Sequence, residues 1–234
     1  MNIIAMGGGG FSMEPNNPRL DRYIINQSEQ LRPKICFLPT ASGDSEQYIQ
    51  RFYTFFKEED CEPTHLSLLK PEVADKESFL LSQDIIYVGG GNTRNLMALW
   101  KEWELDRILE KAWKNGTILA GISAGSICWF DEGPTDSVPG QVTKVKGLGL
   151  LHGSTCPHYD DPEESGEMYR HYIANEELSA GYAMDDGAAI HFVGTDIHKA
   201  ISSRPEAKVY HVAKDENGQD VKETPLEMEY ITIE

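Results

Sequence analysis

Short apolar segments, each bounded by Gly, Pro or Asn, alternate with longer helical patterns over the first half of this chain. Such segments have the length of buried strands, and strands that alternate with helices form mostly parallel sheets. Two intervening stretches, 44–59 and 93–114, space their large apolar residues as one face of a helix. The sequence therefore predicts an α/β fold with a mostly parallel sheet flanked by helices. The expected strands cover 2–6, 35–39, 65–69, 85–88 and 118–120.

The pattern changes after about residue 178 to short alternating segments at 189–193, 199–203, 208–212 and 228–233. Alternation together with the turn sequence Glu-Asn-Gly at 216–218 is typical of antiparallel strands joined by a hairpin. We expect these C-terminal strands to finish one edge of the same sheet. Because the chain has no Pro- or Ser-rich linker, repeat or low-complexity tract, we expect residues 1–234 to form a single domain.

The chain is strongly acidic, with 38 Asp and Glu against 21 Lys and Arg and a formal net charge of −17. Nucleic acids and membrane surfaces attract clustered basic residues, which this sequence lacks, so we expect neither partner. A secretory signal and the roughly 20 apolar residues of a membrane span are also missing. We therefore expect a cytoplasmic protein that is a monomer or a homodimer.

Four cysteines stand singly, at Cys36, Cys61, Cys128 and Cys156, without a C-x-x-C pair. This spacing indicates reduced thiols rather than a zinc site or a disulfide framework. Cys156 differs from the others because it lies two residues before a candidate catalytic histidine. We expect neither a metal nor another cofactor.

The strongest local signal is the G-x-S-x-G sequence Gly121-Ile-Ser123-Ala-Gly125, directly after the expected strand at 118–120. A serine in a sharp strand-to-helix turn has an exposed hydroxyl, and its small neighbours let the chain turn. The helix that follows directs free N–H groups towards an oxyanion. Ser123 is therefore the candidate nucleophile. The rival serine, Ser126, falls inside the helix.

Two further glycine-rich segments follow strands. Glycines 89–91 precede a helix that Asn92 or Thr93 would cap, and such glycines let main-chain N–H groups approach a ligand. The segment is either a phosphate-binding loop, whose usual patterns it does not match, or a second oxyanion donor beside Ser123. The four glycines at 7–10 are a poor dinucleotide motif, because Met13 stands where a third glycine is needed.

A serine nucleophile needs a base, and the base needs an acid to orient it. Among seven histidines, His158 stands out because it lies in the rigid loop Cys-Pro-His-Tyr-Asp-Asp-Pro after an apolar segment. For the acid, Asp185 and Asp186 end the expected strand at 181–184. The spacing leaves other carboxylates open as well, namely those of Asp131, Glu132, Asp136, Asp160 and Asp161.

Taken in order, these segments resemble peptidase E, the α-aspartyl dipeptidase family of serine peptidases that also includes cyanophycinase. The resemblance is densest from Asp84 to Ser126 and extends over nearly the whole chain. It implies a class I glutamine amidotransferase-like fold and a triad of Ser123, His158 and Asp186, with Asp in place of the family's Glu and Asp185 as the alternative. It also implies that the N–H groups of Gly91 and Ala124 bind the oxyanion.

The resemblance implies a serine-type dipeptidase whose substrate is a small peptide, hydrolysed through an acyl-enzyme. Asp136 corresponds to a further important carboxylate of the family, and we also expect Asn92, Tyr159 and Arg170 to contact substrate. The family's aspartate-binding Arg aligns with Tyr169, and Arg170 is one position out of register, about 100° around a helix. The preferred N-terminal residue is therefore left open. The alternatives are a cyanophycinase-like exopeptidase and a non-catalytic small-molecule-binding protein on the same scaffold.

Overall fold

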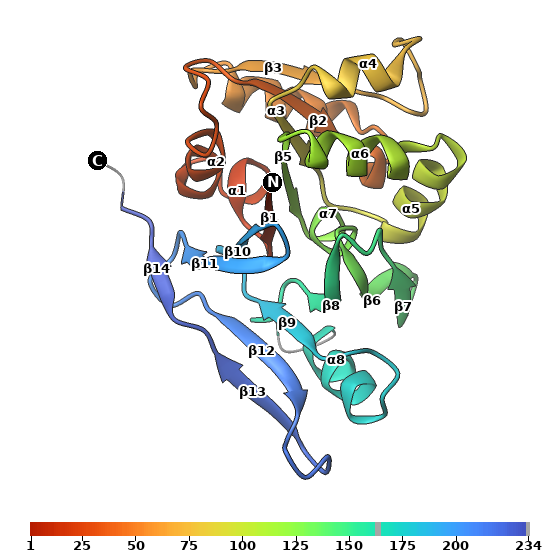
Figure 1. The fold of residues 1–234 in the computed structure, drawn as a ribbon, viewed down its shortest axis with the longest axis vertical. Helices are drawn as coiled ribbons and strands as arrows, with labels where there is room; N and C mark the ends of the chain where they lie inside the picture. Colours follow the sequence, from red (N-terminus) through yellow and green to blue (C-terminus); the bar gives the residue numbers. More distant parts are fainter. Residues whose placement is uncertain (162–164, 233–234) are drawn as a thin grey trace.

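The computed structural model describes residues 1–161 and 165–232, which form two sheets surrounded by helices (Figure 1). The larger sheet has eight strands, in the order β14 (Met228–Tyr230), β11 (Asp196–Ser202), β10 (Ala188–Val193), β1 (Asn2–Met6), β5 (Ile118–Ile122), β4 (Ile85–Val88), β2 (Lys34–Leu38) and β3 (Glu62–His65). The smaller has six, in the order β13 (Val221–Pro225), β12 (Val209–Lys214), β9 (Gly181–Met184), β8 (Leu151–Cys156), β6 (Phe130–Val138) and β7 (Gln141–Lys146).

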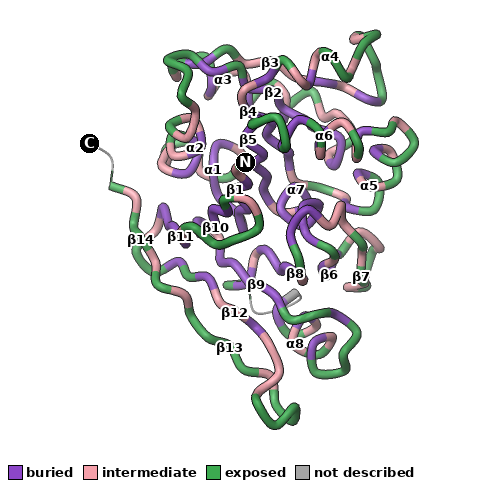
Figure 2. The backbone as a smooth tube through the Cα atoms, in the orientation of Figure 1, coloured by how far each residue is buried: buried purple, intermediate pink, exposed green. Residues whose placement is uncertain are grey.

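The centre of the larger sheet is parallel, as the sequence predicts. Strands β1, β5, β4, β2 and β3 run in the same direction, and β10 pairs with β1 in the opposite direction. Neighbouring side chains on β1 enter different cores: Ile3 packs on one face of the sheet and Ile4 on the other. Both faces are buried, which explains the uninterrupted apolar runs (Figure 2).

Helices cover both faces of this sheet. The helices are α1 (Gly10–Met13), α2 (Arg19–Ile25), α3 (Glu46–Phe56), α4 (Lys76–Leu81), α5 (Thr93–Glu102), α6 (Leu105–Lys114), α7 (Ala124–Ile127) and α8 (Ser165–Ala174), with a 3-10 turn at Thr40–Ser42. The first three pack on one face, through Phe11, Leu20 and Phe52 among others. Helices α4 to α7 pack on the opposite face, and α8 packs on the smaller sheet through Tyr169 and Ile173.

Two expected elements differ from the structure. The helix expected over 93–114 is two helices, because Glu104 between α5 and α6 adopts a left-handed backbone with φ 55°. The strand expected at 65–69 is wrong: β3 precedes it at Glu62–His65. This edge strand is largely polar, whereas the apolar Leu66 and Leu68 that suggested a strand are buried in the loop after it.

The C-terminal strands do not all finish the larger sheet. β10 and β11 are antiparallel strands of that sheet, and β14 adds to its edge in parallel to β11. The hairpin of β12 and β13, which turns at residues 215–220, instead extends the smaller sheet next to β9 (Figure 1). The smaller sheet was not expected, because its strand β6 contains Gly133 and Pro134 and lacks an apolar run.

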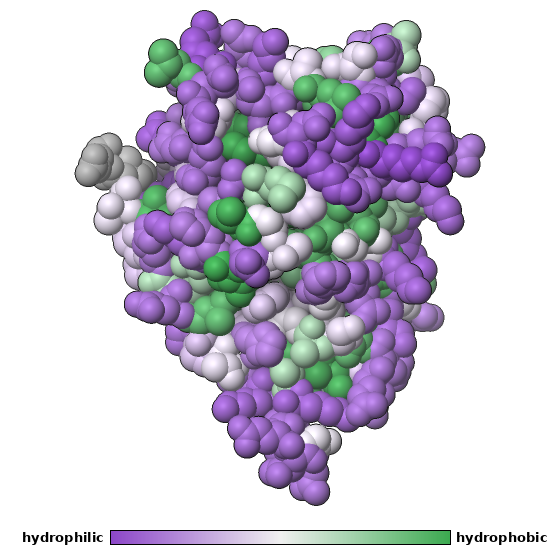
Figure 3. All heavy atoms as spheres, viewed as in Figure 1, coloured by the Kyte–Doolittle hydropathy of each residue, from purple (hydrophilic) through white to green (hydrophobic). Residues whose placement is uncertain are grey.

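The face drawn in Figure 3 is mostly hydrophilic, with hydrophobic residues in small separate groups. Within the described residues, no helix has both the length and the apolar character needed to cross a membrane.

Candidate active site

Ser123 occupies a tight turn between β5 and α7. Its backbone has φ 57° and ψ −117°, a conformation that non-glycine residues rarely adopt. The turn depends on small neighbours: a Cβ on Gly121 would overlap the Gly125 carbonyl, and a Cβ on Gly125 would overlap the main chain of β4. The Ser123 N–H donates to the Met6 carbonyl at 3.3 Å, which ties the turn to β1. The expected strand, turn and helix are therefore all present.

Two main-chain N–H groups beside Ser123 are free to bind a ligand. Among the described residues, neither the Gly91 N–H nor the Ala124 N–H donates a hydrogen bond. The residues on either side of Gly91 differ: the Gly90 N–H donates to a tyrosine hydroxyl at 3.3 Å, and the Asn92 N–H donates to a carbonyl at 2.7 Å. A Cβ on Gly90 would lie 3.2 Å from the Ser123 Cβ, so this loop lies directly against the serine.

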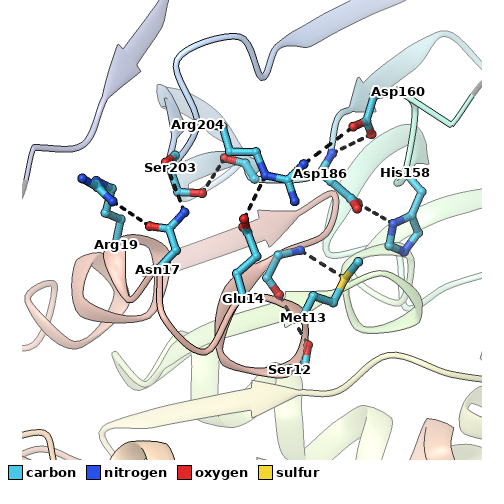
Figure 4. Close-up of polar contacts among 12 residues, drawn as sticks. Ser12, Met13, Glu14, Asn17, Arg19, His158, Asp160, Asp186, Ser203 and Arg204 are labelled. Atoms are coloured by element: carbon cyan, nitrogen blue, oxygen red, sulfur yellow. Dashed lines mark hydrogen bonds and ion pairs between the residues drawn. The ribbon is translucent and has the colours of Figure 1, made fainter.

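His158 and Asp186 form a hydrogen-bonded pair at the ends of two neighbouring parallel strands of the smaller sheet. His158 follows β8, Asp186 follows β9, and His158 Nδ1 lies 2.6 Å from Asp186 Oδ1 (Figure 4). A carboxylate can only accept, so Nδ1 carries the hydrogen and Nε2 of the neutral ring is left as the proton acceptor. Asp185 points elsewhere, because its Oδ2 accepts the Lys208 N–H at 2.9 Å. Of the two aspartates, Asp186 is therefore the one that is hydrogen-bonded to His158.

The electrostatics of this pair favour its charged form. Burial lowers the pKa of His158, but the hydrogen bond and charge of Asp186 raise it. The carboxylates of Asp160 and Asp136 raise it further, so that the pKa of His158 lies above its ordinary 6.5. Burial raises the pKa of Asp186, whereas His158 and Arg204 lower it below 3.8. An imidazolium beside an ionised carboxylate is the state that a general base reaches when it takes a proton.

One cavity connects these groups. It has a volume of about 340 Å³ and is lined by Ser123 and His158 together with the first residues of α5 and part of β6. Asp136 of β6 contributes an exposed carboxylate to this lining. The lining residues are Gly91, Asn92, Thr93, Ser123, Ile127, Pro134, Thr135, Asp136, Ser137, Pro157 and His158.

Three of the residues expected to contact substrate have side chains that form hydrogen bonds with other residues of the protein. Asn92 lines the cavity, but its Oδ1 caps α5 by accepting the Asn95 N–H at 2.9 Å and its Nδ2 donates to the Ser137 carbonyl at 3.0 Å. Tyr159 and Arg170 lie outside the described lining, where Arg170 Nη1 donates to the Tyr159 hydroxyl at 2.9 Å. The geometry therefore gives Tyr159 and Arg170 a role in packing the loop after β8.

Residues that could hold a metal are not gathered here. Within residues 1–161 and 165–232, no group of three or more His, Cys, Asp or Glu side chains has a metal-binding arrangement. The cysteines are free and buried, and burial raises the pKa of the Cys156 thiol well above its ordinary range. The proximity of Cys156 to His158 in the sequence therefore does not make it a reactive thiol.

Residues 3–200 match the model of peptidase family S51. The chain belongs to this family. It is also 58% identical over 229 residues to the protein named uncharacterized peptidase YgaJ of Bacillus subtilis, and the match covers 98% of each chain. The protein is thus a peptidase of family S51, and the resemblance to peptidase E is confirmed.

Two solved structures of other bacterial proteins share the fold. A peptidase from an acI-B1 Actinobacterium matches with a TM-score of 0.65 at 22% identity, over 97% of this chain and 94% of the other. A Listeria monocytogenes protein named as peptidase E matches with a TM-score of 0.62 at 19% identity, over 84% of this chain and 96% of the other. The expected class I glutamine amidotransferase-like α/β fold is therefore confirmed.

Some residues near the site were not singled out from the sequence. Arg204 lies beside the pair from the loop after β11, and Gly8 lies against it from the loop after β1. The sequence offers Asp160 only as a rival acid, whereas in the structure its Oδ1 accepts a hydrogen bond from the Asp186 N–H. The four-glycine segment was the available signal, since it follows β1 at the same end of the sheet as Ser123 follows β5.

Proposed function

We propose that this S51 peptidase is a serine peptidase that hydrolyses short peptides through an acyl-enzyme on Ser123. The observation that carries the proposal is one cavity lined by a strained serine, a histidine paired with a carboxylate and the free N–H of Gly91. The serine lies at the end of a strand, next to a second free N–H on Ala124. This combination meets the needs of acyl transfer.

In the first half of the reaction, Ser123 Oγ attacks the carbonyl carbon of the scissile bond and His158 Nε2 takes the hydroxyl proton. Asp186 holds the Nδ1–H and stabilises the imidazolium. The C–N bond then breaks, and the leaving amine takes the proton from Nε2. Water attacks the ester in the second half, with His158 again acting first as base and then as acid, which restores Ser123.

Ser123 Oγ and His158 are not hydrogen-bonded to each other in the described structure. This contact is commonly long in substrate-free enzymes and shortens when substrate binds. The tetrahedral oxyanion would accept hydrogen bonds from the Gly91 and Ala124 N–H groups. Each such donor stabilises the transition state by about 3 kcal/mol in comparable enzymes.

The cavity suits the N-terminus of a short peptide. At about 340 Å³ it is near the lower end of ligand sites, which favours a dipeptide-sized ligand over a polymer. Asp136 places a carboxylate in the same cavity, where it could bind the α-ammonium group of a substrate. We therefore propose a dipeptidase-like activity in which Asp136 recognises the free amino terminus.

Two serines close in sequence provide a direct test. Ser123→Ala should reduce kcat for dipeptides by roughly 1000-fold or more, and a fluorophosphonate should label wild type at Ser123. Ser126 is fully buried in α7 and its hydroxyl has no partner among the described residues, so Ser126→Ala is the matched control. It should remain active and labelled. Full activity of Ser123→Ala would exclude the proposed mechanism.

A further inference from the structure

Three consecutive residues of the loop after β8 contact the end of β9. His158 Nδ1–H donates to Asp186 Oδ1 at 2.6 Å, and the Tyr159 N–H donates to the Met184 carbonyl at 3.0 Å. Asp160 completes the set, because its Oδ1 accepts the Asp186 N–H at 2.8 Å (Figure 4). Asp186 is therefore held twice by this loop, once through its side chain and once through its main chain.

The other carboxylate oxygen of Asp160 faces Arg204. Asp160 Oδ2 lies 4.0 Å from Arg204 Nη1, and Arg204 Nε donates to Glu14 Oε1 at 3.0 Å. The loop after β8, the loop after β11 and the end of α1 thus meet beside Asp186 (Figure 4). One guanidinium lies among the carboxylates of Glu14, Asp160 and Asp186, where its positive charge offsets their mutual repulsion.

The pair needs such support because His158 is strained. Its φ of 52° lies in the left-handed region, which costs a non-glycine residue of order 1–3 kcal/mol. A misplacement of about 1 Å near reacting groups can reduce a rate about 100-fold. Asp160 is absent from the described lining of the cavity, whereas it contacts the main chain of Asp186 and its charge acts on His158.

We propose that Asp160 is a positioning residue, which fixes the main chain of Asp186 so that the Asp186 carboxylate holds His158 towards Ser123. Arg204 fixes Asp160 in turn, and Glu14 fixes Arg204. The inference rests on the proposed function, because the orientation of His158 affects the rate only if His158 is the base. The alternative is a surface ion pair that holds the loop without affecting the reaction.

Two substitutions of Asp160 separate its hydrogen bond from its charge. Asp160→Ala removes both, and we expect kcat to fall about 10- to 100-fold with little change in KM. Asp160→Asn keeps an oxygen that can accept the Asp186 N–H, so it should restore most of the lost kcat. Asp215→Ala is the matched control, since Asp215 accepts the Gln219 N–H at 2.8 Å in the distant β12–β13 turn.

The pH dependence of kcat/KM gives a second test, because the direction of its shift is predicted. The carboxylates of Asp186, Asp160 and Asp136 face His158 and raise its pKa against the effect of burial. Both Asp160 variants should therefore move the acidic limb of kcat/KM to lower pH, whereas the large loss of kcat should occur in the alanine variant alone. Asp215→Ala should change neither quantity. Arg204→Met should lower kcat by a few fold without raising KM, as expected if Arg204 fixes Asp160.

An NMR measurement keeps this test separate from the test of the function. In Ser123→Ala protein, the His158 Nδ1–H proton should exchange with solvent faster after Asp160→Ala but not after Asp160→Asn. Unchanged exchange and unchanged kcat in Asp160→Ala would overturn the positioning role, as would equal losses of kcat in the two variants. An active Ser123→Ala protein would instead overturn the proposed function, whatever the exchange rates are.

Discussion

Gly8 lies directly against Asp186. The Gly187 N–H donates to the Gly8 carbonyl at 3.0 Å, and a Cβ on Gly8 would overlap Asp186 Oδ1 and lie 2.9 Å from His158 Cε1. The space that a side chain would fill at Gly8 is thus the space that the His158–Asp186 pair occupies. Of the four glycines after β1, Gly8 is the one whose missing side chain leaves room for this pair.

The first prediction follows from this contact. Gly8→Ala should displace the Asp186 carboxylate and reduce kcat at least about 10-fold, since the added methyl group cannot be accommodated without moving the pair. Dipeptide kinetics and thermal unfolding should be measured together. Gly218→Ala, at an open position in the β12–β13 turn, is the control and should leave kcat unchanged. A fully active Gly8→Ala protein would show that the position of Asp186 does not limit the reaction.

The central strands of the larger sheet were predictable because they are buried on both faces. Strands of this kind read as continuous apolar runs, and both β1 and β5 were found in this way. The smaller sheet has no such signal. Its strands β6 and β7 are partly exposed, and β6 contains Gly and Pro, so its pairing depends on contacts distant in sequence.

The site was predictable where a local backbone shape requires particular residues. The turn at Ser123 needs small neighbours and therefore leaves a motif in the sequence. The choice between Asp185 and Asp186 had no such signal, because adjacent residues at a strand end point in opposite directions. The loop and sheet contacts that bring Arg204 to Asp160 join parts of the chain more than 40 residues apart, and no spacing rule reveals them.

The second prediction concerns pH. His158 must be neutral to accept a proton, and its pKa lies above 6.5 because nearby carboxylates outweigh the effect of burial. As pH falls through that raised pKa, kcat/KM should therefore fall, with an apparent pKa above 6.5. Asp136→Asn removes one of these carboxylates and should therefore move the acidic limb of the kcat/KM profile to lower pH. An apparent pKa below 6.5 for the acidic limb of wild type would contradict the assignment of this limb to His158. A shift of the limb to higher pH in Asp136→Asn would contradict it as well.

The third prediction concerns Asp21, whose fully buried carboxyl lies next to the four-glycine segment after β1. Burial raises its pKa from 3.8 to about 7, and the hydrogen bond from Tyr87 at 3.2 Å only partly offsets this. Between these two pKa values Asp21 binds more protons in the folded protein than in the unfolded chain, so its contribution to the free energy of unfolding should fall as pH rises through this window. The loss should reach at most about 4 kcal/mol.

Asp21→Asn cannot ionise and should remove this pH dependence. Its melting temperature relative to wild type should therefore rise between about pH 4 and about pH 8, as measured by thermal unfolding. Asp60→Asn, at an exposed position, is the control and should follow wild type at every pH. A melting-temperature difference between Asp21→Asn and wild type that stays constant over this range would show that the pKa of Asp21 is not raised in the folded protein.

The fourth prediction concerns substrate preference. Among the described residues that line the cavity, Asp136 and His158 are the ones with ionisable side chains, and no Arg or Lys joins them. An N-terminal aspartyl side chain would therefore meet a carboxylate without a compensating cation, in a protein of net charge −17. We expect a panel of X-Leu dipeptides to show faster hydrolysis for neutral or basic X than for Asp.

Asp136→Asn tests the basis of this preference. Loss of a charge-assisted hydrogen bond to the α-ammonium group should raise KM for free dipeptides about 10-fold or more. N-acetylated dipeptides lack this group, so wild type and variant should hydrolyse them equally poorly. Asp131→Asn, on the same strand but outside the cavity, is the matched control and should behave as wild type. If Asp-Leu were instead the best substrate, a cation outside the described lining would have to bind its side chain, and Asp136 would not set the preference.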